Sequence, residues 1–150
     1  MPARFQKHGI AFQYPENWTL GEEESGPGTD AVTVYSPGGA FWSVAMHPPS
    51  EDPLKLAGTA LGAMKQEYPN LDSEEKFESV AGRDLVGFDL NFYYLDLIST
   101  VQIRCLRAGG HTYTIFCQGE DREFDQVSPV FQAITTSLLR ELGGWDEPSE

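Results

Sequence analysis

The residues that most often carry out chemistry are few and scattered in this sequence. Its two cysteines form no CxxC pair, and His8, His47 and His111 show neither HExxH nor HxxxH spacing. No GxSxG nucleophile elbow is present, and the glycines match neither a dinucleotide-binding nor a phosphate-binding loop. A metal site built from the three histidines would require three distant segments to converge. We therefore expect no catalytic residue, no cofactor and no metal.

One group of polar side chains lies along a single expected strand and its neighbour. Asp89 and Asn91 occupy the face opposite the apolar row of their strand, where they can pair with Thr100, Gln102 or Arg104 on the next strand. The group could form a polar pocket with Asp89, Asn91 and Arg104 as its binding residues. A solvated sheet face also accounts for the pattern, and we favour it.

A second polar group is the acidic segment Glu22, Glu23 and Glu24, which is followed by Asp30 in the stretch GEEESGPGTD. This stretch is polar and rich in glycine, which predicts a mobile loop. Weak calcium binding is an alternative role, but the alternating oxygen spacing of an EF-hand loop is missing. We expect the segment to lie on or beside the contact with a protein partner that has a basic surface.

The whole chain is acidic, with a formal net charge of −13 from 23 acidic and 10 basic residues. Phosphate backbones and anionic membranes bind clustered Lys and Arg, so this charge repels both. Arg104 and Arg107 are isolated, and we interpret them as solvated surface charges. Nucleic acid and membranes are therefore not expected as partners, and the oligomeric state is left open.

The chain has the length and composition of one domain. Its 150 residues are 40% hydrophobic, which is enough for one substantial core. We expect a single domain over residues 1–144 and a frayed acidic tail over 145–150. The amino terminus has no apolar run of signal-peptide length, so the expected location is the cytoplasm, unless a leader was removed.

Alternating apolar and polar residues predict strands in the first third of the chain. Residues 10–14 alternate in this way, and YPEN, with Pro15 in its second position, predicts a turn that returns Trp18 to the sheet. We interpret Trp18 as a core anchor rather than a ligand-binding residue. The β-rich runs 31–36 and 40–46 then predict a hairpin.

The middle of the chain changes period and then returns to alternation. Apolar residues at steps of three and four over 54–68 predict an amphipathic helix that begins near Pro53 and is stopped by Pro69. The antiparallel strands expected after it lie at 77–80, 86–94, 97–107 and 113–117, with turns at 81–82, 95–96 and 108–110.

The last hairpin has two possible registers. A two-residue loop at 109–110 sets Cys105 opposite Thr114 and places the two apolar rows on opposite faces. A three-residue loop over 108–110 aligns the rows on one face, and we choose it for that reason. Neither register allows Cys105 and Cys117 to form a disulfide, so both are predicted to be free thiols.

A second helical pattern begins at Glu120 and continues to Leu138, with apolar residues at steps of three and four. Ser128 and Pro129 interrupt this pattern and predict a restart of the helix, with Ser128 as the cap and Pro129 in the first position. The glycines at 143–144 are expected to end it.

Three stretches resemble the PsbP-like domain family, which is named for a photosystem II subunit. They are FQYPENW near the start, AGRDLVGFDLNFYY in the middle and HTYTIFCQGEDREFDQVSPVFQAITTSL at the end, so the likeness covers almost the whole chain. The resemblance implies an α+β fold, an α/β/α sandwich with a mainly antiparallel sheet flanked by helices. This fold is shared with a Ran-binding nuclear import factor and DcrB-like proteins. The resemblance implies no common activity, because members bind different partners.

Three functions are compatible with these observations. We favour a non-catalytic binding or adaptor domain that acts through a protein partner. The first alternative is a small-ligand or lipid-like carrier with a pocket between sheet and helix. The second is a small hydrolase, which requires His47 or His111 to converge with Asp89.

Overall fold

The computed structural model describes residues 2–7, 9–24 and 30–142, so His8 and the expected tail at 145–150 lie outside the described residues. The elements follow one another as β1 (Pro2–Lys7), β2 (Ile10–Pro15), β3 (Thr19–Glu24), β4 (Asp30–Tyr35), β5 (Phe41–His47), α1 (Pro53–Glu67), β6 (Asp72–Val80), β7 (Arg83–Tyr94), β8 (Leu97–Ala108), β9 (His111–Glu120) and α2 (Asp121–Glu141).

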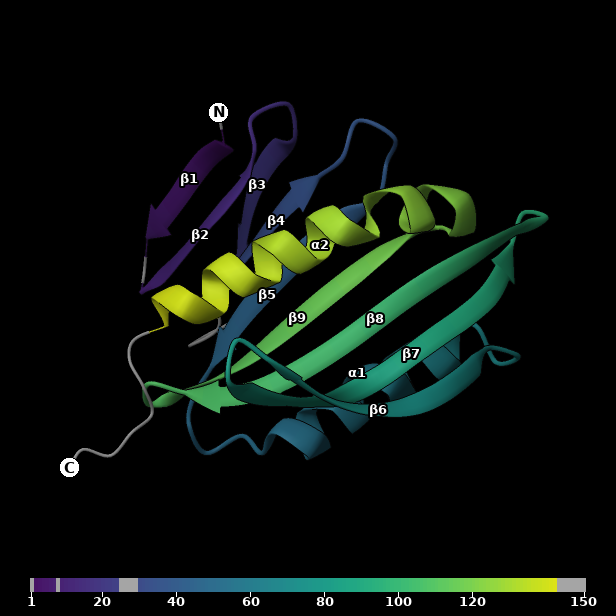
Figure 1. Cartoon of the computed structure of the whole chain (residues 1–150). Helices are drawn as coiled ribbons and strands as arrows, with labels where there is room; N and C mark the ends of the chain where they lie inside the picture. The colour runs from purple at the N-terminus through teal and green to yellow at the C-terminus, as the bar shows by residue number, and fades with distance from the viewer. Residues whose placement is uncertain (1, 8, 25–29, 143–150) are drawn as a thin grey trace.

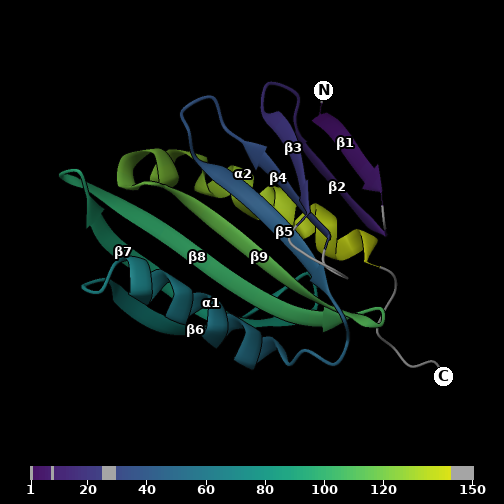
Figure 2. The same ribbon diagram turned by 180° about the vertical axis from the view of Figure 1, so that it is seen from behind.

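The strands form two antiparallel sheets, and helices cover the larger one on both faces. The larger sheet has seven strands in the order β3-β4-β5-β9-β8-β7-β6, and β1 and β2 form a separate ribbon. Figure 1 shows α2 lying across one face, which we call the α2 face, with the ribbon beside it. Seen from behind, α1 covers the opposite α1 face over β7 and β8 (Figure 2). This α+β arrangement is the predicted sandwich.

Helix α1 forms where the change of period predicted it. Asp52 caps its first turn by accepting a hydrogen bond from the backbone N–H of Lys55, and Pro53 occupies a position where no N–H is needed. The helix ends before Tyr68, whose N–H donates to the carbonyl of Met64. Ala57 is its fully buried residue and packs in the cluster that α1 forms with the sheet.

Helix α2 is continuous from Asp121 to Glu141, so the predicted restart at Ser128 was wrong. Pro129 lies inside the helix and contributes no N–H, which removes one backbone hydrogen bond. Phe124 and Phe131 on either side of it are both buried in the same core cluster, and this packing holds the two halves as one helix. In the described part of the chain, neither helix has the length and apolarity required to cross a membrane.

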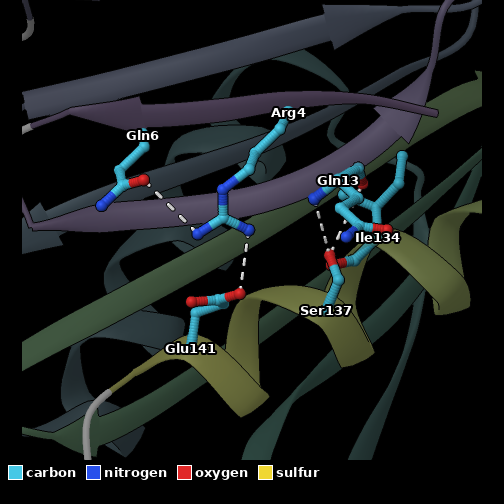
Figure 3. Close-up of polar contacts among 6 residues, drawn as sticks. All are labelled: Arg4, Gln6, Gln13, Ile134, Ser137 and Glu141. Atoms are coloured by element: carbon cyan, nitrogen blue, oxygen red, sulfur yellow. Dashed lines mark hydrogen bonds and ion pairs between the residues drawn. The ribbon is translucent and has the colours of Figure 1, made fainter.

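Of the two strands of the ribbon, β2 was predicted and β1 was not, because residues 2–7 show no apolar alternation. The ribbon is joined to α2 by the polar contacts drawn in Figure 3. The N–H of Gln13 donates to Oγ of Ser137 at 2.9 Å, and Nη1 of Arg4 lies 2.9 Å from Oε2 of Glu141. Beneath these contacts Phe5 and Phe12 are stacked and buried. The last helix therefore secures the first two strands.

Trp18 is buried, as its interpretation as an anchor requires. Its ring meets Phe131 edge-on with centroids 5.9 Å apart, so it joins the turn after β2 to helix α2. The turn itself is shifted by one residue from the prediction. The N–H of Trp18 donates to the carbonyl of Pro15, which places proline first in the turn rather than second.

Two polar segments where no strand was predicted belong to strands at the edges of the sheet. Glu22, Glu23 and Glu24 belong to β3, in register with Val32, Ala31 and Asp30 of β4, so the predicted acidic loop was wrong for these residues. Residues 25–29 lie outside the described residues. At the other edge, β6 begins at Asp72, five residues before the predicted start at Phe77. Edge strands bury little surface and tolerate charge, which is why hydrophobic alternation does not mark them.

The register of the last hairpin is the one that we rejected. Gly109 and Gly110, with φ of 57° and 84°, form a two-residue loop, and Cys105 pairs with Thr114. The two apolar rows therefore face opposite sides, which is stable because each side is covered by a helix. Cys105 faces α1 and Cys117 faces α2, and both are free, as predicted. Burial raises the pKa of Cys105 to about 11.

Candidate functional site

Arg104 lies in the middle of β8 on the α2 face, where it is buried. Its ladder partner is Gly87 of β7, and a Cβ at that glycine would stand 1.7 Å from the carbonyl oxygen of Ile103. Only glycine allows this approach of the two strands. Nη1 of Arg104 donates to the carbonyls of Ile103 at 3.0 Å and Phe88 at 3.3 Å, so the guanidinium lies against the sheet.

Two carboxylates hold the guanidinium of Arg104. Nε donates to Oε2 of Glu78 on β6, and Nη2 lies 2.8 Å from Oδ1 of Asp89 on β7. Burial alone would lower the pKa of Arg104, but hydrogen bonds and attraction from the two carboxylates outweigh it and raise the pKa. The interpretation of Arg104 as a solvated surface charge was therefore wrong. It is a permanent cation that links three strands.

A cavity of about 410 Å³ lies between α2 and strands β6 to β9 of the sheet, and we call it the α2 cavity. Arg104 and Glu78 form part of its wall together with the amide of Gln102. Gln132 and Thr136 of α2 also line it. The volume falls within the range of small-molecule sites, which is about 300–1,000 Å³.

The residues of the predicted polar pocket are separated into two groups. Asp89 binds Arg104, which lines the α2 cavity. Asn91 lies further along β7 and donates to Oγ1 of Thr100 at 2.9 Å, and Thr100 donates to Asp121 at 3.0 Å. Asn91 therefore ties the β7–β8 hairpin to the first residue of α2, outside the cavity.

The histidines do not converge with Asp89. His47 lies on the α1 face, where its Nε2 is 3.1 Å from Oγ1 of Thr114, and burial lowers its pKa. His111 is on β9, six residues from Cys117, which lies in line with Asp89 across β8. That separation is about 20 Å along the strand. Among the described residues, no group of three or more His, Cys, Asp or Glu is placed to hold a metal.

The structure also has an exposed apolar surface that the sequence patterns did not predict. We call it the hairpin tip: residues 93–98, where β7 turns into β8 beyond the neighbouring strands (Figure 1). Tyr93 and Leu95 are 76% and 77% exposed. Tyr94, Leu97 and Ile98 are exposed as well. Apolar residues gathered at a turn were the signal available in the sequence, since turns are normally polar.

Aromatic contacts support the base of the tip, although the side chains of the tip are exposed. The ring of Tyr68, at the end of α1, stacks on Phe92 with centroids 4.0 Å apart and meets Tyr94 edge-on at 6.1 Å. Leu95 and Asp96 form the predicted turn, with φ of 52° and 66°. A leucine in this left-handed region lowers the folding stability by about 1 kcal/mol, whereas asparagine or glycine adopts the conformation with less strain.

The acidic segment 22–24 lies far from the hairpin tip. Glu24 pairs with Asp30 at one end of the seven-stranded sheet, and the ladder continues from there to Met46 and Tyr113. The tip projects from the opposite end, beyond the pairing of Ser99 with Glu120. The two surfaces therefore do not form one continuous patch.

No protein-family model matches this chain, and no curated protein matches it significantly. Similar solved structures exist. The solution structure of cyanobacterial PsbP (CyanoP) from Synechocystis sp. PCC 6803 is 15% identical, covers 91% of this chain and 90% of its own, and has a TM-score of 0.62. Protein PA94 of Pseudomonas aeruginosa, described as of unknown function and a putative regulator, is 10% identical over 99% of both chains, with a TM-score of 0.54.

A third structure, from Bacteroides thetaiotaomicron, is 12% identical and has a TM-score of 0.61. It covers 89% of this chain, whereas this chain covers 46% of that one. Identities this low establish a common architecture and no common activity. In the order of its elements and in their arrangement, this chain has the PsbP-like fold.

Proposed function

We propose that this protein is a non-catalytic binding or adaptor domain that contacts a protein partner through the hairpin tip. The observation that carries the proposal is Leu95, a large apolar side chain that is exposed and held in a left-handed turn. Neither burial nor turn chemistry explains a leucine at this position. Strain of this kind points to function when the surrounding structure maintains it, and Tyr68 and Phe92 provide that support.

The composition of the tip suits a protein contact. Tyrosine is enriched among the residues that dominate binding energy at interfaces, and Tyr93 and Tyr94 directly precede the turn. Because Phe92 and Tyr68 already order the base of the hairpin, binding does not have to order it. The tip therefore meets the two main requirements of a binding anchor, which are apolar area and pre-organisation.

A basic surface on the partner fits the charges around the tip. Asp96 lies at its apex, and Glu120 and Asp121 stand where the hairpin stem meets α2. The segment 22–24 lies too far away to join this contact, and in the proposal it contributes to the acidic field that steers the partner. The same charge argues against nucleic acid and anionic membranes. The cytoplasm stays the proposed location.

The proposal is tested by position-specific photo-crosslinking. A photoreactive phenylalanine analogue is placed at Tyr93, and in a matched control at Phe77, which is 65% exposed on edge strand β6. A protein captured from position 93 and not from 77 is then titrated against the purified domain. Leu95→Asn should weaken its binding at least about tenfold, because an anchor residue is removed.

The control variant for that titration is Ala81→Asn. Ala81 has a φ of 53° in the β6–β7 turn, so the same residue type enters the same backbone conformation away from the tip. Neither variant should lower the melting temperature, and Ala81→Asn should leave binding unchanged. Equal capture from positions 93 and 77, or binding that Leu95→Asn does not weaken, contradicts the proposal.

Of the alternative functions, the carrier is supported by a specific observation. The α2 cavity lies between sheet and helix, as a carrier requires. Its wall holds the Arg104 ion pair and side-chain amides, which suits a small polar ligand better than a lipid.

A further inference from the structure

The α2 cavity has two chemically different sides. Leu85 and Ile115 of the sheet and Phe131 of α2, all three almost fully buried, form its apolar floor. Gln102 of β8 and Gln132 and Thr136 of α2 supply polar groups. Sites that bind small organic molecules combine apolar contacts with a few placed polar groups, and this cavity offers both, with the polar groups in the majority.

The polar groups of the cavity are available to a ligand. Within the described part of the chain, no hydrogen bond engages the side chains of Gln102, Gln132 or Thr136. None of their polar atoms is sealed from solvent either. Two amides and one hydroxyl therefore face the cavity without a protein partner, and a bound molecule can satisfy them without breaking any existing contact.

The charges at the cavity favour a cation. The guanidinium of Arg104 contributes one positive charge, and the carboxylates of Glu78 and Asp89 contribute two negative charges. The cluster therefore has a formal net charge of about −1. Nε and Nη1 of Arg104 are already bound to Glu78 and to backbone carbonyls, and Nη2 lies against Asp89. Few donors remain for an anion. Glu78 is half exposed and binds Arg104 through one of its two oxygens, which leaves the other for a ligand.

We propose that the α2 cavity binds a small organic cation, with an ammonium group beside Glu78 and an apolar frame against Leu85, Ile115 and Phe131. The amides of Gln102 and Gln132 hydrogen-bond to polar substituents on the ligand. This site is distinct from the hairpin tip, because none of the residues 93–98 lines the cavity. It adds a small-molecule ligand to a protein-binding domain.

The experiment compares three probes that share one frame: 2-phenylethylammonium, 2-phenylethanol and 3-phenylpropionate. Each is titrated into the ¹⁵N-labelled full chain at neutral pH, and chemical shifts are followed, including the side-chain amides of Gln102 and Gln132. The ammonium probe should shift these resonances at millimolar concentration and bind about tenfold more tightly than the alcohol, because one opposite charge is added in a partly screened site. The carboxylate should bind least.

Two variants separate the cavity from its surroundings. Glu78→Gln should bring the affinities for ammonium and alcohol within about twofold of each other, while Glu74→Gln should leave the preference intact. Glu74 is the matched control because it projects from the same face of β6 and pairs with Lys76 outside the cavity. Thr136→Phe fills the cavity from α2 without touching the ion pair and should abolish the shifts.

Four results would overturn the proposal. One is an alcohol that binds as tightly as the ammonium, and another is an ammonium preference that Glu78→Gln does not reduce. The third is that no probe shifts the resonances of Gln102 and Gln132 at millimolar concentration, and the fourth is that Thr136→Phe leaves the shifts in place.

Discussion

Replacing Arg104 by methionine should destabilise the fold strongly, and the reason lies in the unequal exposure of its two partners. The side chain of Arg104 is 8% exposed, that of Asp89 is 30% exposed and that of Glu78 is 40% exposed. Oδ1 of Asp89 is buried, and among the described residues the guanidinium of Arg104, with Nη2 at 2.8 Å, is the group that compensates its charge. Glu78 can turn to water, whereas Asp89 would be left buried and unpaired.

Breaking a buried ion pair by removing one partner costs about 3–5 kcal/mol. For a domain of this size each kcal/mol lowers the melting temperature by about 2–4 °C, so Arg104→Met should lower it by about 10 °C. The free energy of unfolding is measured by urea denaturation followed by circular dichroism, with wild type and variant under the same buffer conditions.

A second substitution tests the cause. Adding Asp89→Leu to Arg104→Met removes the unpaired charge and should recover most of the loss, because an apolar pair of similar volume often replaces a buried ion pair without cost. Glu78→Gln alone should cost about 1 kcal/mol, as expected for a partly exposed partner. If Arg104→Met costs less than about 1 kcal/mol, or if the double variant is no more stable than the single one, the ion pair does not secure the strands as described.

Three further predictions concern other parts of the molecule. Trp18→Ala should destabilise the fold by about 3–5 kcal/mol in the same denaturation assay, because it empties a large buried aromatic site, and an unchanged melting temperature would contradict its role as an anchor. Cys105 and Cys117 should resist alkylation in the native protein at pH 8, since burial keeps both as neutral thiols, and both should react after denaturation without reductant. Changing all three glutamates at 22–24 to lysine should slow association with a basic partner severalfold at low salt, and a rate insensitive to both change and salt would exclude steering.

The sequence predicted elements well where one face of an element is apolar. Helix α1 and strands β7 and β8 carry clear periods, and their ends agree with the expected turns at 81–82 and 95–96. Strand β6 begins with DSEEK, and its burial is slight because it lies at the edge, so periodicity could not show its first half. The register after β8 failed for a different reason. The three-residue loop was chosen because it puts both apolar rows on one face, which assumes that the sheet has a single buried face. This sheet is buried on both faces.

The candidate sites depended on contacts that no local pattern contains. Asp89 and Arg104 were recognised as possible cross-strand neighbours, but the burial of Arg104 depends on Gly87, on Glu78 from the edge strand and on α2 above. Whether a polar sheet face is solvated depends on which helices pack over it. Local sequence patterns do not contain this information, because it belongs to the tertiary structure. The hairpin tip escaped notice because its apolar residues at 93–98 continue the strand pattern into the turn.

The attachment of the β1–β2 ribbon to α2 has a consequence for folding during synthesis. The amino terminus of a chain leaves the ribosome first, so Gln13 emerges long before Ser137. Ser137 lies 124 positions later and accepts the hydrogen bond from the N–H of Gln13. Until α2 is made, the buried aromatic rings of Phe5, Phe12 and Trp42 lack the helix that covers them. The nascent chain therefore exposes apolar surface for most of its translation. A chaperone that binds exposed apolar surface would therefore have most of the translation time to bind this chain. The ribbon and the α2 face would be covered together, once α2 has been synthesised.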